Sequence, residues 1–136
     1  MEYPSDYDVD SDMTHQPTPP ELSPYDSFRT AELLFDQRRF TQAAAELESL
    51  LTALGEPTAN GDLPAYEMGA VRTLLARAYY HSAQLGRAES ATRALVEVDP
   101  TDGYAALLLG RTLARQSRHD EAAGWLRRAE ALGVTL

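Results

Sequence analysis

Cysteine, lysine and isoleucine are all absent from the 136-residue chain. The lack of cysteine excludes disulfides, thiolate metal sites and cysteine nucleophiles. Because isoleucine is missing, the β-branched aliphatic residues that favour strands are reduced to five valines, which disfavours a strand-rich fold. No hydrophobic run approaches the roughly 20 residues that a membrane-spanning helix needs, and the N-terminus lacks the basic and apolar regions of a secretory signal. We therefore expect a cytoplasmic protein.

Basic residues are missing from one end of the chain. The formal net charge is -9, and residues 1–26 contain seven acidic residues and no basic one. The acidic residues of this segment are Glu2, Asp6, Asp8, Asp10, Asp12, Glu21 and Asp26. The rest of the chain is nearly balanced, with 12 arginines against 14 acidic residues. This distribution argues against binding to nucleic acid or to anionic membranes, because both require a positively charged surface.

The first 24 residues differ in composition from everything that follows. They hold five of the eight prolines and few aliphatic residues. Such a segment cannot bury enough apolar area to offset the cost of ordering it. We expect a disordered, acidic, proline-rich arm over residues 1–24 and a folded domain over residues 25–136.

The remainder is dominated by alanine and leucine, with 21 and 19 copies, and both residues are strong helix formers. From Pro24 onward, apolar residues recur with a period of about 3.6 residues, which is typical of amphipathic helices. The pattern predicts six helices, near 25–37, 40–54, 63–82, 85–97, 103–116 and 120–132. The stretch 55–65 is predicted as a loop, with Asp62 capping the third helix and Asp102 capping the fifth.

Internal repetition relates these helices to one another. A single shift of the sequence along itself superimposes Leu74 on Leu108, Arg77 on Arg111 and Ala88 on Ala122. The first helix pair matches the second at a longer shift, with Ala31 on Ala76 and Ala43 on Ala88. The longer shift exceeds the shorter one by the length of the loop 55–65. The shorter shift is that of tetratricopeptide repeats, in which a helix-turn-helix unit recurs every ~34 residues.

The chain resembles the tetratricopeptide-repeat family in further details. Small residues are required where the helices cross closely, and Ala76, Gly110, Ala43, Ala88 and Ala122 occupy those positions. The resemblance implies an all-α fold, a short right-handed α-solenoid of three helix-turn-helix hairpins. The repeats lie near residues 24–57, 69–102 and 103–136, with the loop 55–65 inserted after the first.

In this family the first helix of each repeat lines a concave groove. The resemblance places these residues in it: Tyr25, Phe28, Glu32, Phe35 and Asp36; Thr73, Arg77, Tyr80 and His81; Tyr104, Leu107, Leu108, Arg111 and Arg115. Acidic residues from the first repeat would face arginines and tyrosines from the other two. Arginine binds carboxylates through two hydrogen bonds, so an acidic or C-terminal peptide is the expected ligand. The Lys and Asn clamp of chaperone-binding members is absent.

The sequence leaves alternatives to a peptide-binding groove open. The arginines are equally compatible with an ordinary solvated helix face. The acidic arm could also fold back onto Arg77, Arg111 and Arg115 and compete with a partner.

Trp125, on the last helix, has two interpretations. It forms an end surface for a partner or a second copy, or it packs against the C-terminal turn. Glu130 ends the stack with a polar residue, which favours a monomer over a homodimer.

The sequence provides no grounds for catalysis. The three histidines are His15 in the arm, His81 in the groove and His119 in a turn, and no nucleophile, phosphate loop or paired carboxylates accompany them. No cofactor or metal is expected. The predicted function is a non-catalytic adaptor that binds a protein in its groove. The alternative is a structural subunit of a larger assembly, or a homodimer, built through the last helix around Trp125.

Overall fold

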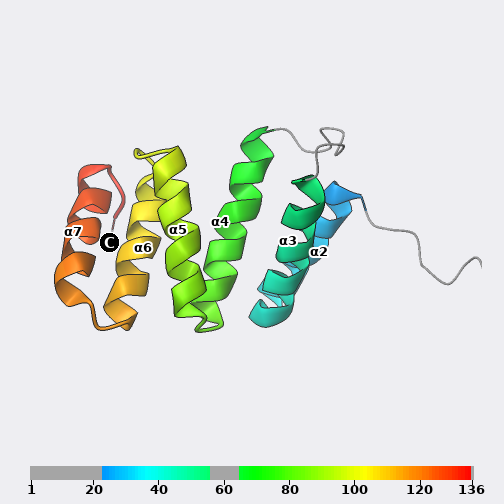
Figure 1. Ribbon diagram of the computed structural model, residues 1–136, viewed down its shortest axis with the longest axis horizontal. Helices are drawn as coiled ribbons and strands as arrows, with labels where there is room; N and C mark the ends of the chain where they lie inside the picture. The colour runs from blue at the N-terminus through cyan, green and yellow to red at the C-terminus, as the bar shows by residue number, and fades with distance from the viewer. Residues whose placement is uncertain (1–22, 56–64, 136) are drawn as a thin grey trace, which may run out of the picture.

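The computed structural model describes residues 23–55 and 65–135, and side chains in the second range from Met68 onward. These residues form six helices joined by turns and contain no strand. They are α2 (Pro24–Asp36), α3 (Phe40–Leu54), α4 (Ala65–His81), α5 (Leu85–Val98), α6 (Gly103–Arg115) and α7 (His119–Ala131). The helices follow one another across the molecule in chain order (Figure 1). The predicted all-α solenoid is therefore confirmed.

Three tight turns, one within each hairpin, share a single backbone geometry. Each contains one residue in the left-handed region, namely Arg38 (φ 63°), Ala83 (φ 61°) and Ser117 (φ 64°). The same two shifts that relate the sequence repeats bring Arg38 onto Ala83 and Ala83 onto Ser117. The repetition seen in the sequence is thus a repetition of backbone conformation, and it unites α2–α3, α4–α5 and α6–α7 as three equivalent hairpins.

The helix boundaries agree with the predictions to within a few residues. Asp102 caps α6 as predicted, because its Oδ1 accepts a hydrogen bond from the Ala105 N–H at 3.0 Å. Ser23 caps α2 and Pro24 is its first residue, so Pro24 belongs to the helix and not to the arm. A proline is well suited to this position because the first turn does not use its missing N–H. The rest of the predicted arm, the predicted cap Asp62 and most of the loop 55–65 lie outside the described residues.

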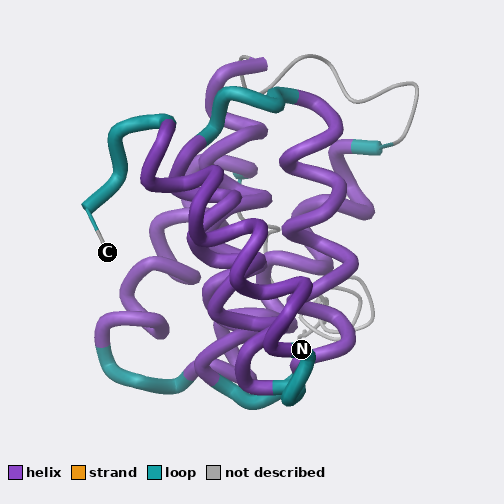
Figure 2. Tube along the Cα trace, turned by 90° about the vertical axis from the view of Figure 1, so that its left-hand side faces the viewer, coloured by secondary structure: helices purple, strands orange, loops and turns teal. Residues whose placement is uncertain are grey.

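The hairpins stack so that each packs on the next through the first helix of the later one. Helix α4 contacts α3, α5 and α2, while α6 contacts α5, α7 and α4. The first helices α2, α4 and α6 thereby form one layer, and α3, α5 and α7 form the other. Figure 2 shows the helices running alternately up and down, with the described turns at the two ends of the helices.

The close crossings within the hairpins depend on the small residues that the repeat pattern singled out. Ala43, Ala76 and Ala88 are completely buried, and Ala122 is nearly so. At Gly110, a β-carbon would lie 2.6 Å from Leu126 Cδ2 and 3.3 Å from the carbonyl oxygen of Ala122. Only a residue without a side chain allows α6 and α7 to approach this closely.

Leu107 and Leu108 correct the sequence prediction. Both were expected to line the groove, but their exposed fractions are only 6% and 5%. Leu108 packs into the core between the second and third hairpins, and Leu107 packs against Ala106 and Ala129. Since α6 lies between α5 on one side and α7 on the other, most of its circumference is buried and little is left for a groove.

Candidate functional site

Aromatic and arginine side chains gather around the C-terminal ends of α2, α4 and α6. Five of the predicted groove residues belong to this group, together with two that the prediction did not include. We call the set the aromatic–arginine cluster, and its members are Phe35, Arg38, Phe40, Arg77, Tyr80, His81 and Arg115. The cluster connects all three hairpins.

Arg77 links the first two hairpins. Its guanidinium carbon lies 4.6 Å from the centre of the Phe35 ring, within the range of a cation–π contact. Its Nε is buried and has no hydrogen-bond partner among the described residues. A guanidinium group has five N–H donors in one plane. The contact therefore positions Arg77 against Phe35, and its buried Nε–H has no partner among the described residues.

Arg115 makes the corresponding contact between the second and third hairpins. Its guanidinium carbon lies 4.7 Å from the centre of the Tyr80 ring, and its Nη1 donates a hydrogen bond of 2.8 Å to the Tyr80 carbonyl oxygen. This bond occupies one of the five donors of Arg115 and orients the remaining ones. Arg77 and Arg115 are thus both positioned by stacking on an aromatic ring of the preceding hairpin.

His81 lies at the centre of the aromatic group. Its ring stacks on Phe40 with the ring centres 4.8 Å apart and an angle of 24° between the planes. It meets the edges of Phe35 and Tyr80 at 5.6 Å and 5.3 Å. A shallow depression of about 250 Å³ opens here, lined by Phe35, Asp36, Arg38, Phe40 and His81.

The surroundings of His81 disfavour its protonated form. Partial burial is the main cause that lowers the pKa of His81, followed by the positive charges of Arg77, Arg115 and Arg38. All of these act in the same direction, because an imidazolium would lose hydration and would be repelled by three cations. At neutral pH, His81 is therefore an uncharged aromatic ring within a positively charged surface.

The arginines of the cluster are not neutralised within the described chain. Ion pairs there involve Arg29, Arg87, Arg93 and Arg118, but none involves Arg38, Arg77 or Arg115. One acidic side chain of the first hairpin lies nearby, since Asp36 lines the depression, whereas Glu32 pairs with Arg29 on α2 at 3.8 Å. The cluster can thus accept an anionic group while its aromatic rings contact apolar parts of the same ligand.

Two exposed residues of α6 that were predicted to line the groove lie apart from the cluster. Tyr104 is 41% exposed and stands at the start of α6, three turns before Arg115, which corresponds to about 16 Å along the helix. Arg111 is exposed one turn before Arg115. Both remain available on the surface of α6.

Sequence reasoning missed Arg38 and Phe40. The predicted helices 25–37 and 40–54 leave Arg38 in the turn between them and make Phe40 the first residue of the second helix. The signal that could have placed Arg38 is the repeat register itself, because the position two residues after each first helix folds back beside the end of that helix.

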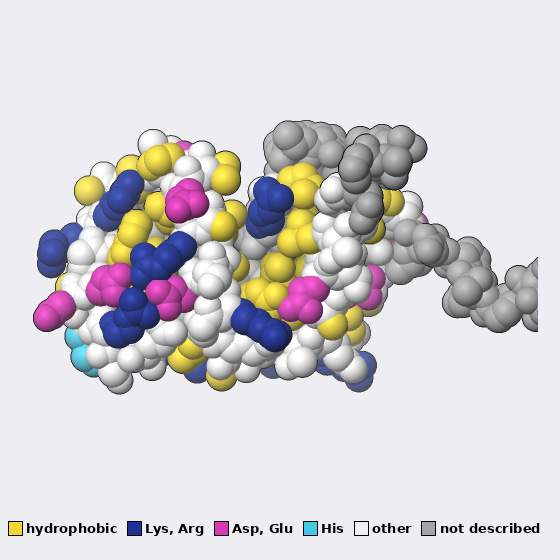
Figure 3. Space-filling view, in the orientation of Figure 1, with side chains coloured by type: hydrophobic (Ala, Val, Ile, Leu, Met, Phe, Trp, Pro, Cys, Tyr) yellow, Lys and Arg dark blue, Asp and Glu magenta, His cyan; other side chains and the backbone are white. Residues whose placement is uncertain are grey.

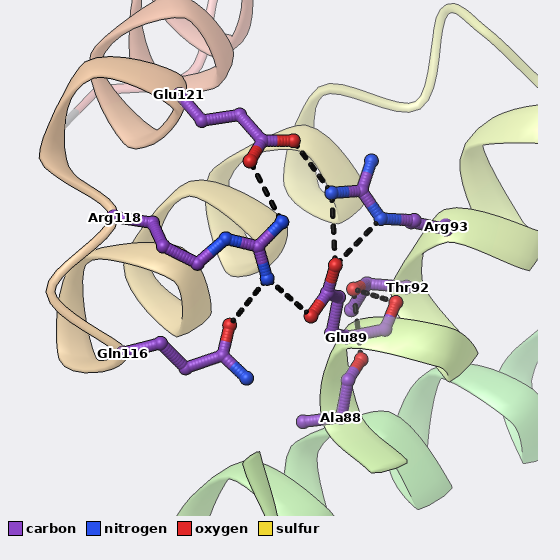
Figure 4. A network of polar contacts seen from close by, with 7 residues as sticks. All are labelled: Ala88, Glu89, Thr92, Arg93, Gln116, Arg118 and Glu121. Atoms are coloured by element: carbon purple, nitrogen blue, oxygen red, sulfur yellow. Dashed lines mark hydrogen bonds and ion pairs between the residues drawn. The ribbon is translucent and has the colours of Figure 1, made fainter. Parts of the chain in front are cut away.

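A second group of charged residues was also missed, and it lies on α5 and around the start of α7 (Figure 4). Glu89 pairs with Arg93 at 2.9 Å and with Arg118 at 2.8 Å, while Glu121 pairs with the same two arginines at 2.7 Å each. Each of the two carboxylates thus pairs with both arginines, which makes a closed ring of four ion pairs. Hydrogen bonds from Arg93 and Arg118 lower the pKa of Glu89 although partial burial acts to raise it. Its charges are mutually satisfied, so it joins the second and third hairpins.

A different contact joins the first and second hairpins. The Tyr79 hydroxyl donates a hydrogen bond to Glu48 Oε2, and Arg87 approaches the same carboxylate at 3.9 Å. Burial and this hydrogen bond raise the pKa of Tyr79 to about 12.

The surface is hollowed between α3 and α5, and hydrophobic side chains line the hollow (Figure 3). Its walls carry mainly small side chains such as Ala45, Ser49 and Ser90.

The side chain of Trp125 packs against the protein core and is only partly exposed to solvent. It is partly buried between the core of the second and third hairpins and the cluster of Ala106, Leu107 and Ala129. The guanidinium carbon of Arg128 covers its ring at 5.1 Å. Of the two interpretations of Trp125, the structure favours packing at the C-terminal turn. Glu130 is exposed at the end of the stack.

The part of the chain that the structure describes contains no group of three or more His, Asp or Glu side chains able to hold a metal ion. Within the same residues, no helix is long and apolar enough to cross a membrane.

Known proteins share this architecture. Residues 73–133 match the family model described as Tetratricopeptide repeat. The chain is similar to the solved structure described as "MamA RS-1 ArsTM double mutant", with a TM-score of 0.66 and 22% sequence identity. The match covers 90% of this chain and 61% of the other, so this chain spans less than two thirds of that protein's length. At this identity the likeness concerns the fold alone. No curated protein matches the sequence.

Proposed function

This chain is a tetratricopeptide-repeat protein, and on that premise we propose that it is a non-catalytic, cytoplasmic adaptor that binds an acidic peptide segment of another protein. Helical-repeat arrays present extended surfaces to partner proteins, and the same backbone serves very different partners. The identity of the ligand must therefore be argued from the side chains of the site.

The observation that carries the proposal is the pair of oriented, unneutralised arginines in the aromatic–arginine cluster. Arg77 and Arg115 stack on Phe35 and Tyr80, so little side-chain entropy remains to be lost when they bind a ligand. Planar guanidinium groups bind carboxylates through two parallel hydrogen bonds. Aromatic residues between the arginines favour a ligand in which acidic and apolar side chains alternate.

The acidic arm supplies a second ligand of the same chemistry in the same molecule. Residues 1–22 carry six carboxylates and no basic residue, and they precede α2, whose far end contributes Phe35 to the cluster. A tethered segment competes at roughly millimolar effective concentration. We propose that the arm weakens partner binding by competing for Arg77 and Arg115. Replacing Asp6, Asp8, Asp10 and Asp12 with Asn is expected to tighten peptide binding, and unchanged affinity would contradict the competition.

A charge-reversal experiment tests the proposed function. The probe is a fluorescein-labelled peptide that alternates Glu and Tyr, prepared with a free or an amidated C-terminus, and binding is followed by fluorescence anisotropy. The double variant Arg77→Glu/Arg115→Glu is expected to lose at least about tenfold in affinity, because each arginine becomes repulsive. The matched control Arg72→Glu/Arg127→Glu changes the net charge equally on exposed positions of α4 and α7.

The outcomes separate the adaptor from a solvated helix face. Loss of binding in the cluster variant alone, with unchanged circular dichroism, supports the proposal. Equal effects of the two double variants contradict it, since non-specific attraction depends only on net charge. A loss on amidation alone identifies the terminal carboxylate as the preferred ligand.

The oligomeric state distinguishes the adaptor from the structural alternative. The partial burial of Trp125 and the exposed Glu130 support a monomer, because neither residue offers a second copy a large apolar surface. Sedimentation at increasing concentration is expected to give a constant mass. Concentration-dependent growth in mass would instead support assembly through the last helix.

A further inference from the structure

His81 is the one histidine in the described part of the chain that sits inside the proposed peptide site, and a histidine is the side chain whose ordinary pKa lies nearest to neutral pH. The residue ends α4, and its ring is held by three aromatic neighbours. Phe40 stacks on one face, while Phe35 and Tyr80 meet the ring at steep angles of 76° and 84°. The ring is therefore fixed in position, but it remains accessible at the mouth of the 250 Å³ depression.

Charged groups surround this ring from every neighbouring element. Arg38 comes from the turn between α2 and α3, Arg77 from α4 itself and Arg115 from α6, whereas Asp36 at the end of α2 is the one carboxylate lining the depression. The two stacked arginines lie against the same aromatic rings that touch His81, at 4.6 Å from Phe35 and 4.7 Å from Tyr80. Three cations thus face one anion around the imidazole.

We infer that an acidic peptide binds this cluster together with a proton, which His81 accepts, an inference that rests on the proposed function. Where no carboxylate of the arm or of a ligand occupies the cluster, the three arginines repel a positive charge on His81. Carboxylates of the ligand, held by Arg77 and Arg115, neutralise that repulsion and add an attraction of their own. The imidazolium then becomes a third cationic contact of the bound peptide.

Thermodynamic linkage gives the sign of the effect. Burial and the arginines lower the pKa of His81 in the free protein, and the ligand raises it again, so the complex holds more protons than its separated parts. Affinity must therefore increase as the pH falls through the interval between the two values. Each unit by which the ligand raises this pKa corresponds to at most tenfold in affinity.

The experiment measures the affinity of the alternating Glu–Tyr peptide at about pH 7.5 and at about pH 5.5, where its carboxylates remain ionised. The full chain is compared with His81→Gln, which keeps a polar side chain but does not titrate. His119→Gln, at the exposed start of α7, is the matched control. Binding to the full chain and to the control is expected to tighten about fivefold at the lower pH, and binding to His81→Gln by less than about twofold.

Because His81→Gln could also disturb the packing of the aromatic rings, a second measurement uses the unmodified chain. Histidine ring signals are followed by NMR as a function of pH, with and without saturating peptide. The peptide should raise the pKa of His81, and the ring signals of His119, which lies outside the cluster, serve as the reference. If the peptide binds through Arg77 and Arg115 but the pH dependence is the same in His81→Gln, or the His81 signal does not shift, this inference fails and the proposed function stands. If the peptide does not bind at either pH, the proposed function itself is refuted.

Discussion

Gly110 provides a sharp test of the packing between α6 and α7, because two opposing effects of one substitution can be weighed. Replacing glycine with alanine inside a helix stabilises it by about 1 kcal/mol, since alanine loses less backbone entropy on folding. At Gly110 the new β-carbon would lie 2.6 Å from Leu126 Cδ2, 2.8 Å from Leu126 Cγ and 3.3 Å from the Ala122 carbonyl oxygen. Rotation of Leu126 alone leaves the backbone contact in place, so α7 must shift.

Overpacking of a close-packed core costs about 1–3 kcal/mol. The sum predicts that Gly110→Ala lowers the free energy of unfolding by about 0–2 kcal/mol, where the helix propensity alone would raise it. Gly124 is the matched control, because it lies inside α7 and a β-carbon there meets nothing within 4 Å. Gly124→Ala is expected to raise the free energy of unfolding by about 1 kcal/mol.

The assay is urea unfolding followed by far-ultraviolet circular dichroism on the wild type and both variants. Since both substitutions share the same gain in helix propensity, their difference isolates the contact with Leu126 and Ala122. That difference should be about 1–3 kcal/mol, with Gly110→Ala the less stable. Equal stabilisation by the two substitutions would refute the close approach of α6 and α7 at Gly110.

Two further predictions concern the contacts between hairpins. Tyr79→Phe removes the hydrogen bond to Glu48 and is expected to cost about 1 kcal/mol in urea unfolding. Burial and that bond raise the pKa of Tyr79 from 10.0 to about 12. The stabilisation is therefore complete below pH 10 and is lost as the pH rises towards 12. In the variant, the free energy of unfolding should not fall with pH over this interval on account of residue 79. Glu89→Gln weakens the network with Arg93 and Arg118. Since the Glu89 pKa is lowered, its stabilisation is present above the ordinary value of 4.5 and is lost as the pH falls below it. Thermal unfolding across that acidic interval should depend less on pH in the variant than in the exposed control Glu97→Gln, and equal slopes would contradict the network.

The candidate site could be foreseen only in part. The repeat register placed Phe35, Arg77, Tyr80, His81 and Arg115 on the first helices, and the structure brings these five together. The same register placed Leu107 and Leu108 in the groove, where they do not belong. A position on a helix wheel does not reveal how far the next hairpin covers it, because that depends on the angle at which the hairpins stack.

The sequence by itself determined the helices, the turns and the small residues at the crossings. These features are local or periodic: helix propensity and apolar spacing define each helix, Asp102 caps its own helix, and the repeat shift fixes equivalent positions. Gly110 and the alanines could be identified because every hairpin needs a small residue at the same place.

Only the tertiary structure decided which side chains meet across hairpins. Arg115 reaches the Tyr80 carbonyl 35 residues away, Tyr79 reaches Glu48 across 31 residues, and Arg118 reaches Glu89 across 29. These separations differ from one another and from the repeat length, so no sequence period points to them. They depend on the rotation and offset between successive hairpins, which the packing of all the side chains at each junction sets together.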